Sequence, residues 1–428
     1  MPKFPDAIEK ELPRASVLRW ASIFLSLSVL TILLSIAASQ LFLTLAGTLY
    51  AVHLLRHPAA PSFPPIKLPL ALFCLTTVIS IGWAENPTLG WLAVRKFTLF
   101  LILLFAVNLI VSGKHLMALY GALCAESAAA GVLAAYQFLE QYRAVRMAHP
   151  NQVYRFMTLF RITGFMGHWI NFGGQQMLVF TVLLGFLLLA RREGGAAAAG
   201  ERAAAGGSPM NALGWLAFAL VCLSILLNLS RGVWLGCFVA GVYLVARWRA
   251  RWLLALPALL AIGFFAAPKL VRERAESLVR PAGDSSIAMR VEFLQVGLNM
   301  IRRHPWVGVG PNNIPEVYNL YLPRGQAPIP GYHDHLHNNF VQFAAERGLP
   351  CLAAWVWLMM ALGWHAWHVR GEVSHLRWVV DAGIAGWMAM MVEGTFEYSF
   401  GSTPVLMLFL FVIASPFVVQ NLERASWK

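Results

Sequence analysis

The sequence predicts an all-α polytopic membrane protein with about twelve transmembrane helices. Of its 428 residues, 58% are hydrophobic and 12% are charged, whereas soluble domains carry roughly 25% charged residues. Its mean hydropathy is +0.62, and apolar stretches of about 20 residues, long enough to cross a bilayer as helices, recur along the chain. This composition excludes disordered, collagen-like, disulfide-scaffold and nucleic-acid-binding classes.

Twelve apolar segments define the predicted spans. A hydropathy window of about 19 residues finds them, with boundaries good to a few residues. They are 17–37, 40–55, 66–83, 89–111, 115–139, 172–190, 211–229, 232–249, 251–268, 338–366, 376–394 and 402–420. Eleven or thirteen spans are the alternatives, because 232–268 can be divided differently around Pro257.

The distribution of Lys and Arg predicts the orientation of these spans. Cytoplasmic loops carry an excess of both residues, and every second loop of this chain is basic. The basic positions are Lys3, Lys10, Arg14, Arg19, Arg56, Lys67, Lys114, Arg191, Arg192, Arg202, Arg247, Arg249, Arg251, Arg370, Arg377, Arg424 and Lys428. Three short loops of the opposite set carry no Lys or Arg. We therefore expect both termini to lie in the cytoplasm.

Three longer segments interrupt the short loops. Residues 191–210 form a low-complexity cytoplasmic linker, whereas 140–171 and 269–337 lie on the outer, periplasmic side. The last segment is too long for a plain connector and holds helix-like stretches separated by Pro and Gly. The predicted organisation is therefore transmembrane helices one to nine (1–268), a large, partly helical periplasmic loop subdomain before the tenth helix (269–337), and helices ten to twelve (338–428).

Arg231 lies in a short turn, Asn228-Leu-Ser-Arg231-Gly232, between two predicted spans. A charge beside the membrane is costly, which makes it a candidate functional residue. The turn is too short to form a solvated face, so the guanidinium points either to lipid headgroups or into the helix bundle. We favour a specific anion site, because other arginines on the outer side are available to join it.

A second candidate element, Arg161-Ile-Thr-Gly-Phe-Met-Gly167, precedes an apolar span. Gln175 and Gln176 follow within the first turns of that span, where polar side chains need partners. Two interpretations stay open for these glutamines. They either line a donor-rich cavity, in which Gln176 binds substrate, or they form hydrogen bonds between helices.

Arg290 follows a helix-start pattern of Asp and Ser, and a plain surface position is an equal alternative to a binding role. With Arg161 and Arg231 it would suit a diphosphate, because guanidinium groups bind phosphate oxygens in bidentate fashion. No Walker-type loop or GxGxxG pattern occurs. Glu393 and Glu397 end the eleventh predicted span, where they orient a sugar or, as we prefer, pair with an arginine.

The run Gly331-Tyr-His333-Asp334-His335-Leu-His337-Asn338 ends where a long apolar helix begins. Three interpretations compete: metal binding by the histidines and Asp334, a structural helix cap, and a general base at His337, since histidine is the residue type suited to take a proton near neutral pH. If the helix begins near His335, the polar residues Asn338, Gln342 and Glu346 recur every four positions and form one stripe.

Four sequence elements carry a family resemblance. They are Arg161-Ile-Thr-Gly-Phe-Met-Gly, Leu229-Ser-Arg231-Gly-Val-Trp-Leu, Met289-Arg290 with His304-Pro-Trp-Val-Gly-Val-Gly310, and His335-Leu-His337-Asn338-Asn-Phe with Glu346-Arg-Gly348. Their order and spacing resemble the O-antigen ligase/polymerase superfamily of bacterial envelope glycosyltransferases over about residues 90–420. The chain departs from the family at Gly167-His168-Trp-Ile-Asn171, where Asn-Pro-Asn-like residues are usual.

Among the superfamily, the chain is most similar to the ligases of lipopolysaccharide biosynthesis. The resemblance implies a multi-pass protein of the bacterial inner membrane with its active site facing the periplasm. The implied donor is O-antigen polysaccharide linked to undecaprenyl diphosphate, and the implied acceptor is a hydroxyl of the lipid A–core oligosaccharide. Membrane lipids are expected partners and nucleic acid is not.

The resemblance also implies roles for single residues. His337 would accept the proton of the acceptor hydroxyl in an inverting, single displacement. Arg161, Arg231 and Arg290 would hold the diphosphate and stabilise the leaving group, with Gln176 and Asn338 as further substrate-binding candidates. The outer segments contain no tight carboxylate pair for Mg²⁺, so no metal or cofactor is expected.

Three other functions remain as alternatives. O-antigen polymerases and protein O-oligosaccharyltransferases of the same superfamily share these motifs, and only the acceptor separates them from a ligase. A transporter of organic anions is the alternative from another class. Transporters often contain paired repeats with helices broken in mid-membrane, and we find no such repeat.

Overall fold

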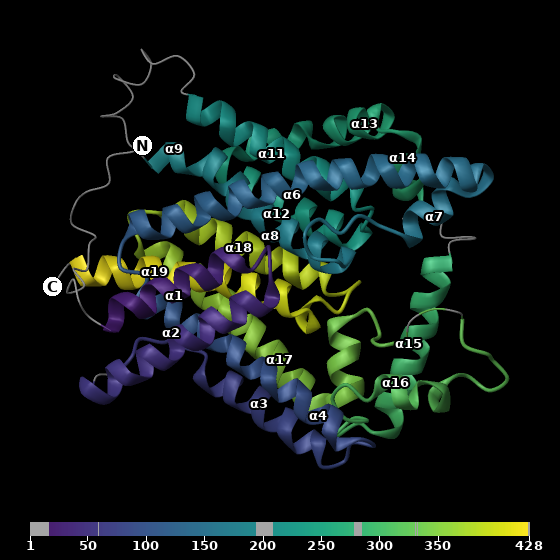
Figure 1. The fold of residues 1–428 in the computed structure, drawn as a ribbon, viewed down its shortest axis with the longest axis horizontal. Helices are drawn as coiled ribbons and strands as arrows, with labels where there is room; N and C mark the ends of the chain where they lie inside the picture. The colour runs from purple at the N-terminus through teal and green to yellow at the C-terminus, as the bar shows by residue number, and fades with distance from the viewer. Residues whose placement is uncertain are drawn as a thin grey trace.

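The computed structural model describes residues 17–58, 60–193, 209–277, 285–329, 331 and 333–426. Within these ranges the chain forms helices joined by short connections and no β-strand, so the predicted all-α class is confirmed. Figure 1 shows most helices running side by side, with α15 and α16 set apart at one end. Most of the predicted linker 191–210 lies outside the described residues.

The helices follow one another along the chain with short connections between most of them. The first half of the chain contains α1 (Val17–Thr31), α2 (Ile36–Arg56), α3 (Lys67–Ile81), α4 (Pro87–Val94), η2 (Arg95–Phe100), α5 (Leu101–Leu109), α6 (Gly113–Ala148), η3 (Pro150–Gln152), α7 (Val153–Leu159), α8 (Trp169–Gly185), η4 (Phe186–Ala190) and α9 (Arg191–Glu193). The second half contains α11 (Pro209–Leu227), α12 (Arg231–Arg249), η6 (Ala250–Ala255), α13 (Leu256–Ala266), α14 (Lys269–Glu276), α15 (Ser285–Arg303), α16 (Ile314–Val317), η7 (Tyr318–Tyr321), α17 (Asn339–Glu372), α18 (Arg377–Glu393), η8 (Ser399–Gly401) and α19 (Thr403–Ser426).

Each of the twelve predicted spans coincides with one of these helices or with a helical run. By length and composition, 7 helical stretches of the described residues could cross a membrane, and three shorter apolar helices accompany them. The protein is therefore a multi-pass membrane protein in character. The number of twelve crossings and their orientation stay predictions.

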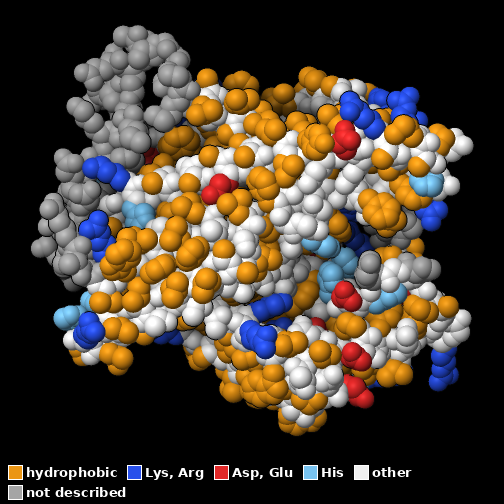
Figure 2. All heavy atoms as spheres, in the orientation of Figure 1, with side chains coloured by type: hydrophobic (Ala, Val, Ile, Leu, Met, Phe, Trp, Pro, Cys, Tyr) orange, Lys and Arg blue, Asp and Glu red, His pale blue; other side chains and the backbone are white. Residues whose placement is uncertain are grey.

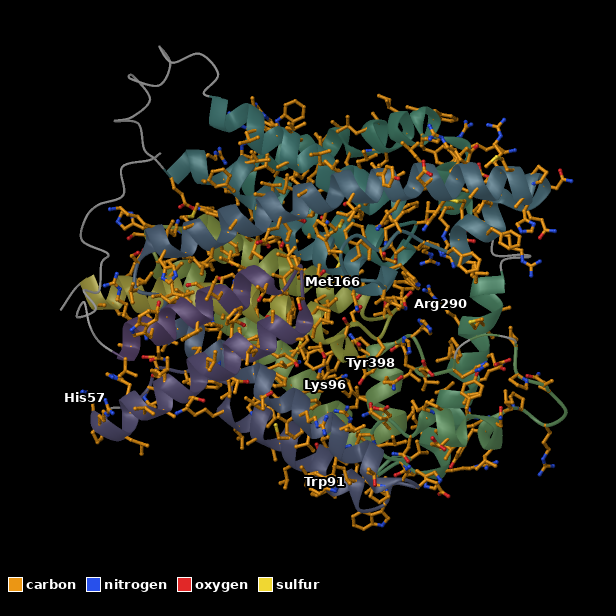
Figure 3. The ribbon with its side chains drawn as sticks, in the orientation of Figure 1. His57, Trp91, Lys96, Met166, Arg290 and Tyr398 are labelled. Atoms are coloured by element: carbon orange, nitrogen blue, oxygen red, sulfur yellow. The ribbon has the colours of Figure 1, made fainter. Side chains whose placement is uncertain are left out.

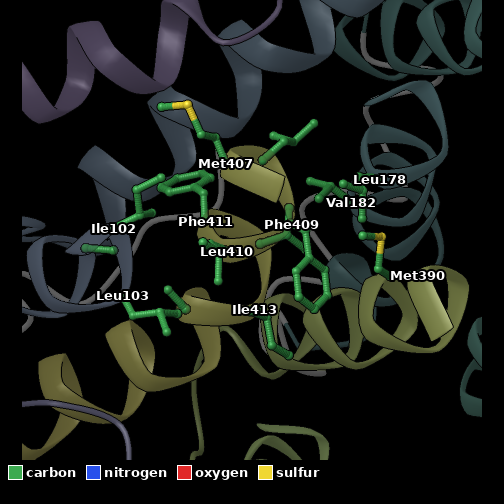
Figure 4. Close-up of a cluster of buried hydrophobic side chains, with 14 of the residues drawn as sticks. Ile102, Leu103, Leu178, Val182, Met390, Met407, Phe409, Leu410, Phe411 and Ile413 are labelled. Atoms are coloured by element: carbon green, nitrogen blue, oxygen red, sulfur yellow. The ribbon is translucent and has the colours of Figure 1, made fainter. Parts of the chain in front are cut away.

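The helices α8, α18 and α19 form the centre of the bundle. In α8 with η4, and again in α19, 89% of the most apolar stretch is buried inside the protein. Figure 4 shows Phe409 and Phe411 of α19 within this core, with Leu178 and Val182 of α8 nearby. Burial on all sides explains why these two segments are apolar around their whole circumference. They form the scaffold from which the polar connections at one end project.

The long helix α17 is kinked near one third of its length. Gly348 has a φ of 81° and Pro350 follows it, so the carbonyl groups of Ala345 and Glu346 lose their usual helical partners. The segment that precedes α16 replaces them: the amides of Val309 and Gly310 donate to these two carbonyls at 2.9 and 2.8 Å. The kink is therefore a docking site for the His304–Gly310 segment.

The predicted subdomain 269–337 packs in two separate places. Its first helix, α14, packs through Leu270 and Val271 on Met157 of α7 and Leu229 before α12. Its later part builds a small core of its own around Phe293, Val296, Tyr318 and related residues. The partly helical character predicted for this segment is confirmed, and its boundaries as a unit stay a prediction. Asp284, the Asp of the helix-start pattern before Arg290, lies outside the described residues.

The docking at the kink makes a testable prediction about stability. Gly308 has a φ of 67°, and a Cβ atom there would lie 2.2 Å from the carbonyl carbon of Glu346. We expect Gly308→Ala to destabilise the protein by about 2–4 kcal/mol, from backbone strain and overpacking together. Thermal unfolding of the purified protein in detergent measures this loss.

Gly325→Ala is the matched control, because Gly325 has a φ of 77° but no atom within 4 Å of the added Cβ. It carries the backbone strain without the clash. Equal losses in the two variants would mean that the segment is not tightly docked on α17.

Candidate active site

Two of the predicted site residues meet on one carboxylate. Arg290 of α15 forms an ion pair with Glu397 through Nη2 and Oε1, and Nδ1 of His337 lies 2.6 Å from Oε2 of the same residue. Glu397, in the connection between α18 and η8, is 1% exposed. The preferred pairing of this glutamate with an arginine is confirmed. Because one carboxylate holds both side chains, Arg290 and His337 have fixed positions relative to each other.

The position of His337 depends on the start of α17. Its backbone has a φ of 49°, in the left-handed region. The side chain of Asn338 caps the helix by accepting from the amides of Phe340 and Val341 at 2.8 and 3.0 Å, and it donates to the carbonyl of Thr395 at 2.9 Å. These bonds occupy both ends of the Asn338 amide. They tie the helix start to the connection that carries Glu397, and they lend no support to a direct substrate contact by Asn338.

The predicted polar stripe on α17 is a hydrogen-bonded chain. Gln342 accepts from the amide of Leu336 at 2.7 Å and donates to Glu346 at 2.8 Å. The same oxygen of Glu346 accepts from the amide of Asn312 at 2.9 Å. The stripe therefore fixes the segments on either side of α17, including the residue that precedes His337.

The histidine run divides into two groups. The His335 and His337 rings stack with centroids 4.2 Å apart, and Phe293 stacks on His337 at 5.1 Å. His333 lies instead beside Tyr318 and near Glu292. Burial, and then the charge of His337, lower the pKa of His335 to about 3, so His335 is neutral at pH 7. Among the described residues, no three His, Cys, Asp or Glu side chains are grouped so that they could hold a metal ion.

Arg231 begins α12 and is 4% exposed. Its Nη1 donates to the hydroxyl and the carbonyl of Ser277 at 3.0 and 3.3 Å. A Cβ atom on Gly232 would lie 3.1 Å from Cβ of Phe396, so the turn packs closely on the connection that carries Glu397. The bundle interior, rather than the lipid headgroups, surrounds this arginine.

Arg161 is fixed by its own loop and by α6. Its Nε donates to the carbonyl of Thr158 at 2.9 Å, and its guanidinium lies 3.9 Å from the ring centroid of Trp169. Gln137 of α6 holds the loop by accepting from the amides of Thr163 and Gly164 at 3.1 and 3.0 Å. The arginine is therefore oriented in advance, by stacking and by a clamped turn.

Arg274 is a member of this group that the sequence did not single out. It is 1% exposed, and its Nε donates to the carbonyl of Leu229 at 3.0 Å. Leu229 has a φ of 55°, so this bond stabilises the strained turn that presents Arg231. The helix α14 contains several charged residues, and no sequence signal distinguishes Arg274 from its neighbour Arg272.

Charges around Glu397 perturb one another. Burial would raise the pKa of Glu397, but Arg290, His337 and Arg161 lower it to about 2. Burial, and then Arg274, lower the pKa of Arg161 to about 9, with Arg290 and Arg231 acting in the same direction. Several buried arginines thus act on one another around a single shared carboxylate. This excess of positive charge is an arrangement that an anion would stabilise.

Gln176 does not join this group. It is buried between α8 and α6, where it accepts from the Ser127 hydroxyl at 2.5 Å and donates to the Ser127 carbonyl at 3.2 Å. Gln175 donates to the carbonyl of Ile32 at 2.9 Å. Hydrogen bonding between helices, the second of the two interpretations, is what the contacts of both glutamines show. The substrate-binding role of Gln176 therefore lacks support from its surroundings.

The face that carries these residues is hollowed. Figure 2 shows histidine side chains around a hollow, with Lys or Arg side chains inside it. In the same orientation, Figure 3 places Arg290 beside this region and Tyr398 nearer the centre of the molecule. Buried arginines around a carboxylate and an oriented histidine are a class of site that would suit an anionic substrate.

Comparison with known families agrees with this class. The family model described as O-antigen ligase matches residues 216–356, a stretch that contains Arg231, Arg274, Arg290 and His337. The match supports the O-antigen ligase superfamily that the motifs resemble, whose members are glycosyltransferase-like enzymes. Arg161 and Glu397 lie outside the matched residues. No curated protein matches the chain.

The shared carboxylate predicts a loss of activity on substitution. Glu397→Gln keeps the shape of the side chain but removes the charge that orients His337 and balances Arg290. We expect turnover to fall by about 10²-fold or more, as when the acid that orients a catalytic histidine is lost. Because the pKa of Glu397 is about 2, the wild-type carboxylate stays charged throughout the neutral range, and its titration does not limit the wild-type rate there.

Glu316→Gln is the matched control, since Glu316 is an exposed acid of the same outer segment. Turnover is measured as transfer of glycan to an acceptor lipid, alongside the melting temperature. Full turnover in Glu397→Gln would contradict an orienting role for the carboxylate.

Proposed function

We propose that the protein is an O-antigen ligase. It transfers O-antigen polysaccharide from undecaprenyl diphosphate to a hydroxyl of the lipid A–core oligosaccharide, at the periplasmic face of the bacterial inner membrane. The observation that supports this most directly is the buried Glu397, which orients His337 on one oxygen and pairs with Arg290 on the other. In this proposal His337 is the base for the hydroxyl and Arg290 is a cation for the diphosphate.

His337 is the proposed general base. Its Nδ1 faces Glu397, so the proton of the neutral ring resides on Nδ1 and leaves Nε2 free to accept another. The acceptor hydroxyl attacks the anomeric carbon and gives its proton to Nε2. The new bond joins the acceptor oxygen to the anomeric carbon, and the bond from that carbon to the diphosphate oxygen breaks with inversion.

The arginines stabilise the departing diphosphate. Negative charge grows on the bridging oxygen as the glycosidic bond breaks, and preorganised donors aimed at such an oxygen lower the barrier. The side chain of Arg290 is 23% exposed, and that of His337, the other partner of Glu397, is 17% exposed. Because Arg290 is the more open of the two, we assign it the first contact with the diphosphate. Arg161 and Arg231 supply the surrounding field, and Arg274 holds the turn of Arg231 in place.

The proposed chemistry needs no nucleotide. The bond between sugar and diphosphate supplies the driving force, and undecaprenyl diphosphate leaves as the second product. The guanidinium groups carry the positive charge that a divalent cation provides in other enzymes of phosphate chemistry. We therefore propose transfer that is independent of metal ions.

A reconstitution tests the proposal. Purified protein is mixed with undecaprenyl-diphosphate-linked glycan and lipid A–core, with and without a chelator, and the size of the core lipid is followed on a gel. We expect product in both conditions, and a loss of about 10²–10⁴-fold in His337→Ala because the base is gone.

His368→Ala is the matched control, because His368 is exposed at the far end of the same helix, α17. Longer undecaprenyl-linked chains without core product would indicate a polymerase instead. Product that requires a divalent cation would contradict the metal-independent mechanism, and no product from folded protein and sound donor would overturn the proposed transfer.

A further inference from the structure

The apolar helical run Pro87–Leu109 is broken at a pair of cations. The run consists of α4, the 3₁₀ turn η2 and α5, and η2 begins with Arg95 and Lys96. A 3₁₀ stretch within a helix often marks a functional hinge or a sequence under strain. Arg95 is exposed, whereas Lys96 is half-buried and donates from Nζ to the carbonyl of Gly401 at 2.5 Å. A lysine that turns inward within an apolar run is a candidate functional residue.

Contacts of α4 indicate the depth of this break. The amide of Asn86 donates to Asn313 at 2.7 Å, and Asn312 donates to the carbonyl of Leu89 at 3.1 Å. The helix α4 is therefore level with the outer segment that contains α16. Trp83, just before α4, and Trp91 within it are exposed, and exposed tryptophans are frequent at the membrane interface. Lys96 follows Trp91 by five residues, so its long side chain can extend back toward this interface.

A narrow crevice of about 20 Å³ lies between η2, α17 and the start of α19. Its walls are mostly phenylalanine rings, with Lys96, Arg347 and Tyr398 as the polar lining. Arg347 is 5% exposed. Its Nε lies 3.6 Å from the Glu346 carboxylate in an ion pair, and its guanidinium packs on the Phe343 ring. The ammonium group of Lys96 at the edge of these apolar walls suits the phosphate of a lipid headgroup.

The crevice is separate from the arginine group but connected to His337. In Figure 3, Tyr398 lies between Lys96 and Arg290. The Tyr398 ring is 6.0 Å from that of His335, which stacks on His337 at 4.2 Å. The connection that binds Lys96 through Gly401 also carries Glu397. The general base therefore stands between two cationic regions.

We propose that Lys96, with Arg347 behind it, binds a phosphate of the acceptor glycolipid at the mouth of this crevice. This inference rests on the proposed glycosyl transfer, and it assigns the side from which the acceptor approaches. In an inverting displacement, the hydroxyl and the leaving diphosphate lie on opposite faces of the anomeric carbon. If the arginine group holds the diphosphate, the acceptor must reach His337 from the other side, which is the side of Lys96.

The chemistry of the lysine fits this role. An ammonium group is a compact point charge with three donors, so it can keep its bond to Gly401 and still donate to a phosphate oxygen. Its aliphatic stem lies along apolar walls, as is usual for lysines near a membrane interface. The charge also reaches the active site, since Lys96 is among the cations that lower the pKa of His335.

Kinetics of Lys96→Met test the proposal, because Met keeps the length and apolar character of the stem. We expect the KM for lipid A–core to rise about tenfold to hundredfold, the loss of one charged hydrogen bond, with the KM for the donor unchanged. With an acceptor from which the phosphates have been removed, wild type and variant are expected to have equal KM values. Lys96→Arg keeps the charge and is expected to retain most of the affinity.

Lys67→Met is the matched control, since it removes one exposed lysine from the predicted opposite side of the membrane. A higher KM for the donor alone would assign Lys96 to the donor and overturn the proposal. An equal effect of Lys96→Met on phosphorylated and dephosphorylated acceptors would also overturn it, because phosphate recognition would then play no part.

Binding measured without turnover separates this proposal from the proposed function. Native mass spectrometry of the full chain in detergent, with added lipid A or its dephosphorylated form, reports retention directly. We expect wild type to retain lipid A over the dephosphorylated lipid and Lys96→Met to lose that preference. Retention that depends on Lys96 in a protein without transferase activity would refute the ligase and keep the site, whereas no preference in wild type would refute the site itself.

Discussion

The arrangement of the candidate active site depends on one buried carboxylate. Glu397 is enclosed in the protein yet ionised, because Arg290 and His337 share its two oxygens and charge repays the cost of burial only when partners are this close. Arg290 comes from α15, His337 from the start of α17 and Glu397 from the connection after α18. Three distant parts of the chain are thereby held in one constellation, and the turn of Arg231 packs against the same connection.

Several hydrogen bonds at the start of α17 support this arrangement of His337 and Glu397. Asn338 binds the backbone of residue 395, Asn339 donates from its amide to Gly394 at 2.7 Å, and the Asn339 side chain accepts from Phe400 at 3.2 Å. Asn338 and Asn339 carry no charge, yet their hydrogen bonds fix the distance between His337 and Glu397. Positioning of this kind is what a single displacement requires, because its efficiency depends on geometry within fractions of an ångström.

Hydropathy along the sequence predicted the helices, and pairing between distant side chains was harder to foresee. Apolar runs identified a helix at each of the twelve segments, because burial in lipid or in a bundle needs the same composition. The glutamate near the end of α18 was expected to pair with an arginine, but nothing local indicated that His337 would share it. Arg274 was missed because its role depends on the strained carbonyl of Leu229, a contact between elements 45 residues apart. Gln176 is the opposite case. It was a candidate for substrate binding, but its side chain accepts a hydrogen bond from Ser127 of another helix.

The kink at Gly348 divides α17 into a short outer part and a long inner part. The outer part is fixed by the segment docked on it and by the polar stripe, while the inner part packs among apolar helices. Because Gly348 and Pro350 interrupt the helical hydrogen bonds between the two parts, the backbone that presents His337 is held by the docked segment and not by the inner part alone. We infer that the reaction centre is mechanically insulated from the lipid. Activity should then vary little between membranes that differ in chain length, unlike that of proteins in which one rigid helix joins the solvent-facing site to the hydrocarbon.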